Sequence, residues 1–266
     1  LLGYRRLMAI FTRDNRNIGY NVAGEGAPIL AFHGTTQAGN AWDQVRAACT
    51  PLQWVNFEFP GSGESSMPDS PIDLDTMVDD AVALMSSLGH ESFHVTGYSL
   101  GAVAALQTAS RHSGKVMSVT SLCGWAVTDA RMRLTFDVWR RLIEIDPALF
   151  MRYALVDGYT AAGLAAIEPM HQMVIDIASS AVQPGSDAHL ELDLRINIDD
   201  SLSSVSAPCL VIGGIEDRWV DISHSRYLAT RIAHATLLEL PAGHLVIGEM
   251  ADAIAGAMSH HINSLN

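Results

Sequence analysis

Short apolar runs alternate with amphipathic stretches along most of the chain. Apolar runs that end in a turn or at a glycine lie at residues 27–34, 52–63, 92–97, 116–125, 208–214 and 235–244. Each run is short enough to be a buried strand. Regular alternation of such strands with helices is typical of an α/β fold, in which helices cover both faces of a mostly parallel sheet.

The amphipathic stretches have the spacing of helices. Between Ile72 and Gly89, apolar side chains recur every three or four residues, and Gly89 stands where a helix would end. A run of small and apolar residues predicts a second helix from Leu100 to Arg111. A third helix is expected from Val246 to Ile262.

One long segment departs from this alternation. From residue 126 to residue 201 the pattern predicts helices but no strand, whereas the segments on both sides belong to the sheet. We therefore expect residues 1–125 and 202–266 to form one core domain. Residues 126–201 are expected to form a helical cap subdomain, inserted before the strand at 208–214.

Composition narrows the classes of partner. The chain has 266 residues, 48% of them hydrophobic, and a formal net charge of -13, which disfavours binding to nucleic acid or to an anionic membrane. No apolar run reaches the roughly 18 residues that cross a bilayer. Cys49, Cys123 and Cys209 show no paired spacing and are expected to be free thiols. We expect a cytoplasmic protein that acts on a small molecule, and a homo-oligomer is compatible with the sequence.

The residues Gly97-Tyr98-Ser99-Leu100-Gly101 fall between a predicted strand and a predicted helix. They match the pattern G-x-S-x-G, in which a sharp strand-to-helix turn holds a serine hydroxyl out above the sheet. Glycine suits the outer positions because a Cβ there would collide with neighbouring backbone. A plain turn is the alternative, but the place between strand and helix favours Ser99 as a nucleophile.

An acid and a histidine follow the last two predicted strands. Asp217 lies on the first of these loops, with Glu216 and Asp221 as rival acids, and His244 lies on the second. The carboxyl ends of parallel strands meet at one edge of a sheet, so these side chains are expected to lie together. Serine, aspartate and histidine in this chain order match one type of catalytic triad. We interpret Ser99 as nucleophile, Asp217 as orienting acid and His244 as base; an exposed acidic loop and a surface histidine are the alternatives.

The first predicted strand of the chain, at residues 27–34, runs into His33-Gly34-Thr35. We expect the backbone N–H groups of Thr35 and Leu100 to form an oxyanion hole beside the serine. His33 is expected to orient this loop rather than to act as a base. A simple turn at His33-Gly34 is the alternative.

Together these motifs resemble the α/β-hydrolase superfamily, from the strand before His33 to the C-terminal helix. The stretch FPGSGES, from Phe59 to Ser65, is similar to the G-x-G-x-S loop of that superfamily. Thr35-Thr36 departs from its more usual G-x-G ending, and no H-G-G-G motif of the lipase and hormone-sensitive branches is present. Haloalkane dehalogenases and epoxide hydrolases carry aspartate where this chain has Ser99.

The resemblance implies a serine hydrolase that forms an acyl-enzyme on Ser99, with no cofactor and no metal. The expected substrate is a small to medium, largely apolar ester, lactone or thioester. Three alternatives stay open: carbon–carbon bond hydrolysis of a diketone-like acid, acyl transfer to an alcohol, and a ligand receptor without catalysis.

Candidate substrate-binding residues are the polar and aromatic side chains near these motifs and in the cap. They are Gln37, Trp42, Tyr98, Trp125, Trp139 and Trp219. Four arginines at the start of the cap are candidates to bind a substrate carboxylate or phosphate, and a solvated helix face is the alternative. They are Arg131, Arg133, Arg140 and Arg141.

Overall fold

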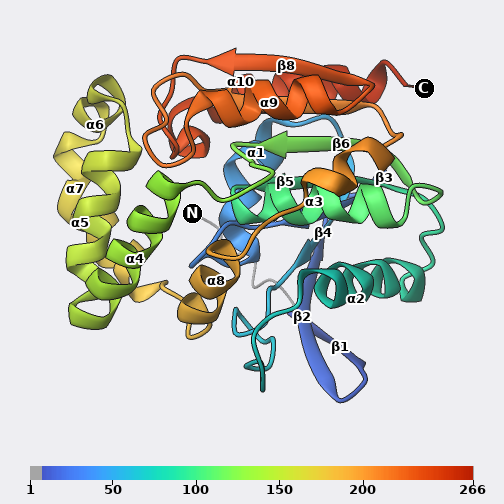
Figure 1. Ribbon diagram of the computed structural model, residues 1–266, viewed down its shortest axis with the longest axis horizontal. Helices are drawn as coiled ribbons and strands as arrows, with labels where there is room; N and C mark the ends of the chain where they lie inside the picture. Colours follow the sequence, from blue (N-terminus) through green and yellow to red (C-terminus); the bar gives the residue numbers. More distant parts are fainter. Residues whose placement is uncertain (1–7, 266) are drawn as a thin grey trace.

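An eight-stranded sheet runs through the middle of the molecule (Figure 1). The computed structural model describes residues 8–265. The strands lie in the order β1-β2-β4-β3-β5-β6-β7-β8. β2 is antiparallel to both β1 and β4, and every later pair of neighbours is parallel. This mostly parallel sheet with flanking helices confirms the predicted α/β fold.

The strands and the helices of the core follow the predicted alternation. The strands are Ala9–Arg13 (β1), Arg16–Ala23 (β2), Ala27–Phe32 (β3), Leu52–Phe57 (β4), Phe93–Tyr98 (β5), Val116–Leu122 (β6), Cys209–Gly214 (β7) and Ala235–Leu240 (β8). The helices are Asp43–Ala48 (α1), Leu74–Ser87 (α2), Leu100–Arg111 (α3), Ile222–Arg231 (α9) and Val246–Asn263 (α10), with short 3-10 helices at Gly39–Trp42 and Asp199–Ser204.

Alternate residues of the central strands pack on opposite faces of the sheet. Leu30 and Phe32 of β3 belong to a hydrophobic cluster with α2 and α3, whereas Ile29 and Ala31 belong to a second cluster with α1 and α10. This two-residue period is the one expected for a strand buried on both faces. The apolar runs of the sequence therefore form strands because both of their faces are covered.

A helical insertion separates β6 from β7. It contains Ala130–Ile145 (α4), Pro147–Gly158 (α5), Ala161–Ala166 (α6), a 3-10 turn at Glu168–Met170, His171–Ser180 (α7) and Ser186–Asp193 (α8). Figure 1 shows α4 to α7 gathered beside the core, with α8 leading back to it. Asp129 and Asp146 cap α4 and α5 with their side-chain oxygens, which explains where these helices begin. Within residues 8–265, every helix is too short or too polar to pass through a lipid bilayer.

Several elements differ from the sequence prediction. The β1–β2 hairpin and helices α1 and α9 were not predicted, and the strands predicted at 52–63, 116–125 and 235–244 end earlier, at Phe57, Leu122 and Leu240. The hairpin turns at Asp14 and Asn15, which both have positive φ. Asp-Asn is a milder form of the Asn-Gly signal for such turns, and the two strands carry many polar residues.

The close packing of α3 against the sheet is testable by substitution of Gly101. A Cβ at this position would collide with the carbonyl oxygens of Phe32 and His33. We expect Gly101→Ala to lower the free energy of unfolding by about 3 kcal/mol or more, measured by urea denaturation. The control is Gly256→Ala in α10, where a Cβ meets nothing, and which should raise stability by up to about 1 kcal/mol. Equal effects of the two substitutions would contradict this account.

Candidate active site

Ser99 lies on a strained turn between β5 and α3. Its backbone has φ 57° and ψ -120°, a conformation that residues other than glycine rarely adopt. A Cβ on Gly97 would collide with the carbonyl of Gly101, so the two glycines let the strand and the helix approach this closely. The turn leaves the Ser99 side chain at the carboxyl end of the sheet, and the residue is 7% exposed.

Three predicted residues form one hydrogen-bonded chain. His244 Nε2 lies 3.0 Å from Ser99 Oγ, and His244 Nδ1 lies 2.6 Å from Asp217 Oδ2. A carboxylate only accepts hydrogen bonds, so Nδ1 carries the proton and Nε2 accepts one from the Ser99 hydroxyl. This is the tautomer that allows Nε2 to act as a base.

Asp217 is held in place by the residues that follow it on the same loop. Its Oδ1 accepts hydrogen bonds from the backbone N–H groups of Trp219 and Val220, both at 2.9 Å. The two rival acids have other surroundings: Glu216 is exposed, and Asp221 caps α9 through Ser223 N–H. Of the three acids on this loop, only Asp217 contacts His244.

The loop that carries His244 is fixed from both sides. The buried Tyr98 hydroxyl donates to the His244 carbonyl at 2.9 Å, and the Gly243 N–H donates to Glu249 Oε1 at 2.9 Å. Burial is the main cause that raises the pKa of Tyr98, so this hydroxyl keeps its proton and remains a donor. The imidazole thus has a defined position before any ligand binds.

His33 braces the loop after β3. Phe59 N–H donates to His33 Nε2 at 3.0 Å, so His33 Nδ1 carries the proton and donates to the Gly34 carbonyl at 2.8 Å. Complete burial lowers the pKa of His33 to about 3 and keeps the ring neutral. Gln37 also holds this loop, because its Oε1 accepts from the Gly34 N–H at 3.0 Å.

Two backbone donors beside Ser99 are left without acceptors. Among the described residues, the Thr35 N–H contacts no acceptor. The Leu100 N–H is the first of α3, and the first N–H groups of a helix lack partners within it. Both belong to segments that adjoin Ser99, which is the arrangement an oxyanion hole requires.

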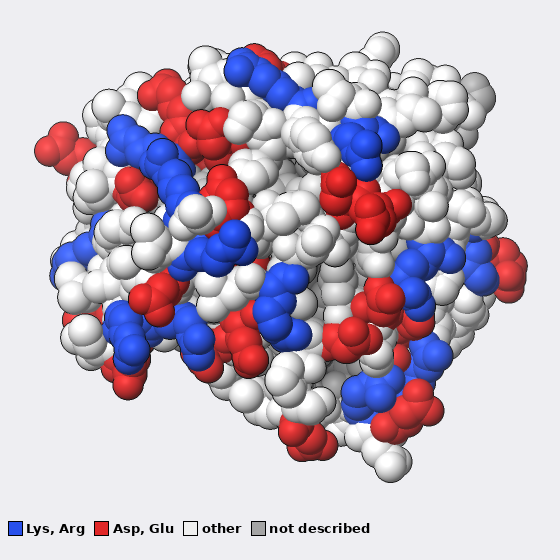
Figure 2. All heavy atoms as spheres, in the orientation of Figure 1, with Lys and Arg blue, Asp and Glu red and all other residues white. Residues whose placement is uncertain are grey.

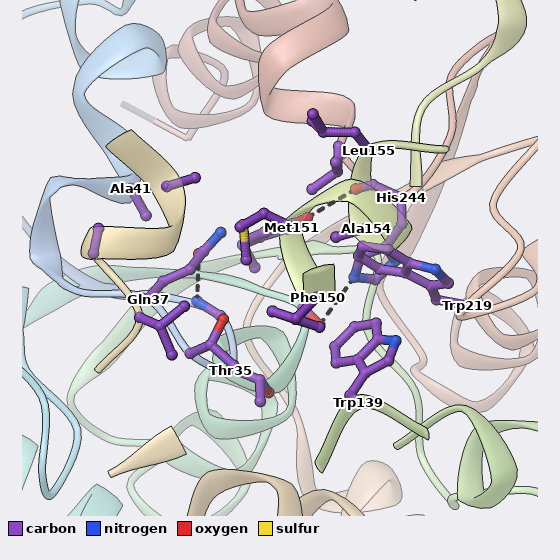
Figure 3. A pocket seen from close by; sticks show the side chains of 18 of the residues that line it. Thr35, Gln37, Ala41, Trp139, Phe150, Met151, Ala154, Leu155, Trp219 and His244 are labelled. Atoms are coloured by element: carbon purple, nitrogen blue, oxygen red, sulfur yellow. Dashed lines mark hydrogen bonds between the residues drawn. The ribbon is translucent and has the colours of Figure 1, made fainter. Parts of the chain in front are cut away.

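An apolar cavity of about 310 Å³ opens over Ser99 and His244. Figure 3 shows Gln37 and Ala41 on one side of it and the α5 side chains Phe150, Met151, Ala154 and Leu155 approaching from the helical insertion. Of the predicted binding residues, Gln37, Tyr98, Trp139 and Trp219 line it. The Trp219 ring lies against both His244 and Trp139, with centroids 4.8 and 4.4 Å away.

Two predicted binding residues do not line this cavity, and the prediction was wrong for them. Trp42 is buried in the core, where its Nε1 donates to the Phe32 carbonyl at 3.0 Å. Trp125 is buried in the other hydrophobic cluster, where its Nε1 donates to Thr128 Oγ1 at 2.9 Å. Both lie near the motifs along the chain, but their side chains point back into hydrophobic clusters.

The four arginines at the start of the helical insertion also lie outside the cavity, and no lysine or arginine within residues 8–265 lines it. Arg140 pairs with Asp187 at 2.6 Å, and Arg141 pairs with Glu144 at 3.3 Å. Positive and negative side chains are interspersed over much of the face seen in Figure 2. The alternative interpretation, a solvated helix face, describes Arg140 and Arg141.

Cys123 is a neighbour of the site that sequence reasoning missed. Together with Asp217 and His244 it forms the group of potential metal ligands found within residues 8–265. Burial raises the pKa of the Cys123 thiol, which disfavours the thiolate that binds metals, and Asp217 and His244 are already bonded to each other. The donor set therefore fits a hydrogen-bonded pair better than a metal centre. No motif in the sequence signals Cys123.

Comparison with known proteins identifies the family. Residues 29–257 match the model of the alpha/beta hydrolase family, so the chain belongs to this family and is an enzyme of the α/β-hydrolase type. The resemblance inferred from the motifs is confirmed.

Relatives of similar length are known in bacteria. The pyrrolizixenacetamide deacetylase of Xenorhabdus hominickii is 27% identical over 86% of this chain and 88% of its own. A Caulobacter sp. (strain K31) protein named provisionally as carbamate hydrolase RutD is 28% identical over 83% of this chain and 84% of its own. The solved enol-lactonase of Burkholderia xenovorans LB400 has a TM-score of 0.84 at 20% identity, covering 96% and 100% of the two chains, and shows that the fold is shared.

The support that Tyr98 gives to the histidine loop is testable by stability. Tyr98→Phe leaves the buried His244 carbonyl without its donor and should lower the free energy of unfolding by about 1–3 kcal/mol. The matched control is Tyr227→Phe, because the Tyr227 hydroxyl bonds Asp199 on the surface. That change should stay within about 0.5 kcal/mol. Urea denaturation of both variants measures the difference, and equal losses would contradict the proposed support.

Proposed function

We propose that this protein is a serine hydrolase that cleaves small to medium, largely apolar esters, lactones or thioesters through an acyl-enzyme on Ser99. The observation that carries the proposal is the chain of contacts from Ser99 Oγ through His244 to Asp217, at 3.0 and 2.6 Å. This constellation activates a serine hydroxyl in acyl transfer.

The mechanism has two halves. His244 Nε2 takes the proton of the Ser99 hydroxyl while Ser99 Oγ attacks the substrate carbonyl carbon, and Asp217 stabilises the resulting imidazolium. The Thr35 and Leu100 N–H groups receive the negative oxygen of the tetrahedral intermediate, each contributing about 2.7–4 kcal/mol. His244 then returns the proton to the leaving group. Water, activated by the same histidine, releases the acyl group and regenerates Ser99.

The cavity lining favours an uncharged, apolar substrate. Trp139, Phe150 and Leu155 present hydrocarbon and aromatic surface, and the lining formed by the described residues has no lysine or arginine to bind a carboxylate. Hydrolysis of a diketone-like acid would be expected to use such a cation. We therefore favour bonds between an acyl carbon and oxygen or sulfur, and we infer that the helical insertion acts as the cap that shapes this cavity.

The names of the relatives agree with acyl chemistry. They describe a deacetylase, a carbamate hydrolase and an enol-lactonase. Acetyl groups, carbamates and lactones all contain a carbonyl carbon open to attack by a serine hydroxyl. The deacetylase also makes the amide of a short acyl group a second candidate substrate, to be tested beside the esters.

The role of Ser99 is tested by turnover of a p-nitrophenyl ester series from acetate to decanoate. We expect wild-type turnover, and we expect Ser99→Ala to lower kcat by up to roughly a million-fold, because the nucleophile is lost. The control is Ser203→Ala on an exposed turn, with unchanged rates. Labelling of Ser99 by a serine-reactive phosphonate without turnover of any ester or amide would instead favour a ligand receptor.

The assignment of the cavity wall is tested by chain-length preference. We expect Trp139→Ala to move the preferred acyl group to a longer chain, because truncation of a lining side chain enlarges the cavity. The matched control is Trp125→Phe, which changes a buried side chain outside the cavity and should leave the preferred length unchanged. An unchanged preference in Trp139→Ala would contradict the assignment.

A further inference from the structure

A second buried aspartate lies behind the candidate oxyanion hole. Asp193 is the last residue of α8, fully buried, and its Oδ2 accepts a hydrogen bond from the Thr35 hydroxyl at 2.7 Å. Its Oδ1 has no partner among the described residues. Thr35 thus joins two features: its N–H is a candidate oxyanion donor at the cavity that Thr35 lines, and its hydroxyl is held by the helical insertion.

The surroundings of Asp193 contain little positive charge to balance a carboxylate. His189 lies one turn earlier on α8, and His33 lies on the loop after β3, but burial lowers their pKa values to about 4 and about 3, so both rings are neutral. Glu58, whose Oε2 lies 3.9 Å from His33 Nε2, adds no positive charge. Arg195 directs its guanidinium to the carbonyls of Glu191 and Ile72.

Burial therefore dominates the ionisation of Asp193. It raises the pKa of this carboxyl to about 8, against a lowering by the Thr35 hydrogen bond. At neutral pH the group is mostly protonated and uncharged. A neutral carboxyl still accepts the Thr35 hydrogen bond through its carbonyl oxygen.

The charge of this group matters because of where it lies. Hydrolysis by Ser99 places a negative oxygen on the Thr35 N–H, and Asp193 contacts the same residue from behind. A second negative charge at this distance, in a buried site of low dielectric, opposes the oxyanion. A neutral group leaves the oxyanion undisturbed while it fixes the loop.

We propose that Asp193 is a positioning residue of the oxyanion hole. Neutral Asp193 holds Thr35 in place, and ionisation of Asp193 switches the oxyanion hole off. This inference rests on the proposed hydrolase function. It makes the helical insertion a structural part of the oxyanion hole, in addition to a wall of the cavity.

The test compares pH profiles of kcat/KM for a p-nitrophenyl ester. The wild-type value should fall above about pH 8, approaching about tenfold per pH unit. Asp193→Asn keeps an acceptor for Thr35 but cannot ionise, so its profile should lack this fall. The matched control is Asp187→Asn, an exposed carboxylate on the same helix, which should keep it.

Variants of Thr35 show whether the hydrogen bond matters. Thr35→Ser keeps the hydroxyl and should retain the wild-type midpoint. Thr35→Val removes the hydrogen bond that lowers the pKa of Asp193, so the fall of kcat/KM in this variant should move to higher pH. The same alkaline fall in wild type and Asp193→Asn would overturn the proposal, as would a midpoint unchanged in Thr35→Val.

Two measurements separate this inference from the proposed function. The first is the rate of Ser99 labelling by a phosphonate, which needs the nucleophile and the hole but no turnover. Wild-type protein that is never labelled overturns the hydrolase and, with it, the role of Asp193. Labelling whose pH dependence is identical in wild type and Asp193→Asn overturns only the role of Asp193.

The second is stability against pH, which needs no activity. Between the ordinary carboxyl pKa of 3.8 and the folded value of about 8, the folded protein holds a proton that the unfolded chain has lost. Wild-type stability should therefore fall as pH rises through this window, relative to Asp193→Asn. The difference between them should grow up to about pH 8 and then stay constant. A difference that does not change with pH overturns the neutral state of Asp193.

Discussion

The backbone conformation of Ser99 is the constraint on which the site depends. A positive φ at a residue with a side chain is costly, and it persists only where the surroundings leave no alternative. Here β5 and α3 meet at Gly97 and Gly101 with no room for a Cβ, so the chain must reverse within the turn. The same contact brings the N-terminus of α3 against the end of β3, beside the Thr35 loop.

The parallel sheet then gathers the other functional groups at the same edge. β7 and β8 are hydrogen-bonded neighbours, and the loops that follow them carry Asp217 and His244. Since these residues lie 27 positions apart, only the pairing of the two strands brings them to 2.6 Å. Two local braces, from Tyr98 and Glu249, then remove the remaining freedom of the histidine loop.

Much of this was predictable because it depends on backbone periodicity. Strand and helix patterns place residues at strand ends, so the Ser99, Asp217 and His244 loops were found from the sequence. The direction of a side chain is not encoded in such patterns, which is why Trp42 and Trp125 were predicted to bind substrate although they are buried outside the cavity, whereas Trp139 and Trp219 line it. The β1–β2 hairpin was missed because its strands mix polar and apolar residues and are exposed at several positions, so they form no continuous apolar run.

Contacts between segments far apart in the sequence could not be predicted, for a different reason. Asp193 meets Thr35 across 158 residues, and although Thr35 belongs to a recognised motif, no motif marks Asp193. One turn of α8 carries two side chains that contact distant segments. Besides Asp193, His189 contacts the loop after β4, where its Nε2 lies 2.9 Å from the Pro60 carbonyl oxygen. Only the packing of α8 under the loops after β3 and β4 brings these groups to the site.

The two buried aspartates beside the site differ in the donors that surround them. Asp217 accepts two backbone N–H bonds on Oδ1 besides the bond of His244 on Oδ2, so both of its oxygens have donors. Asp193 accepts one hydroxyl bond and keeps one oxygen unpartnered among the described residues, surroundings that stabilise the neutral acid. Each matches the charge that the proposed hydrolysis would place next to it: an imidazolium beside Asp217 needs an anion, and an oxyanion in front of Asp193 needs none. The same residue type thus serves opposite electrostatic needs, because the balance between burial and hydrogen-bond donors differs between the two positions.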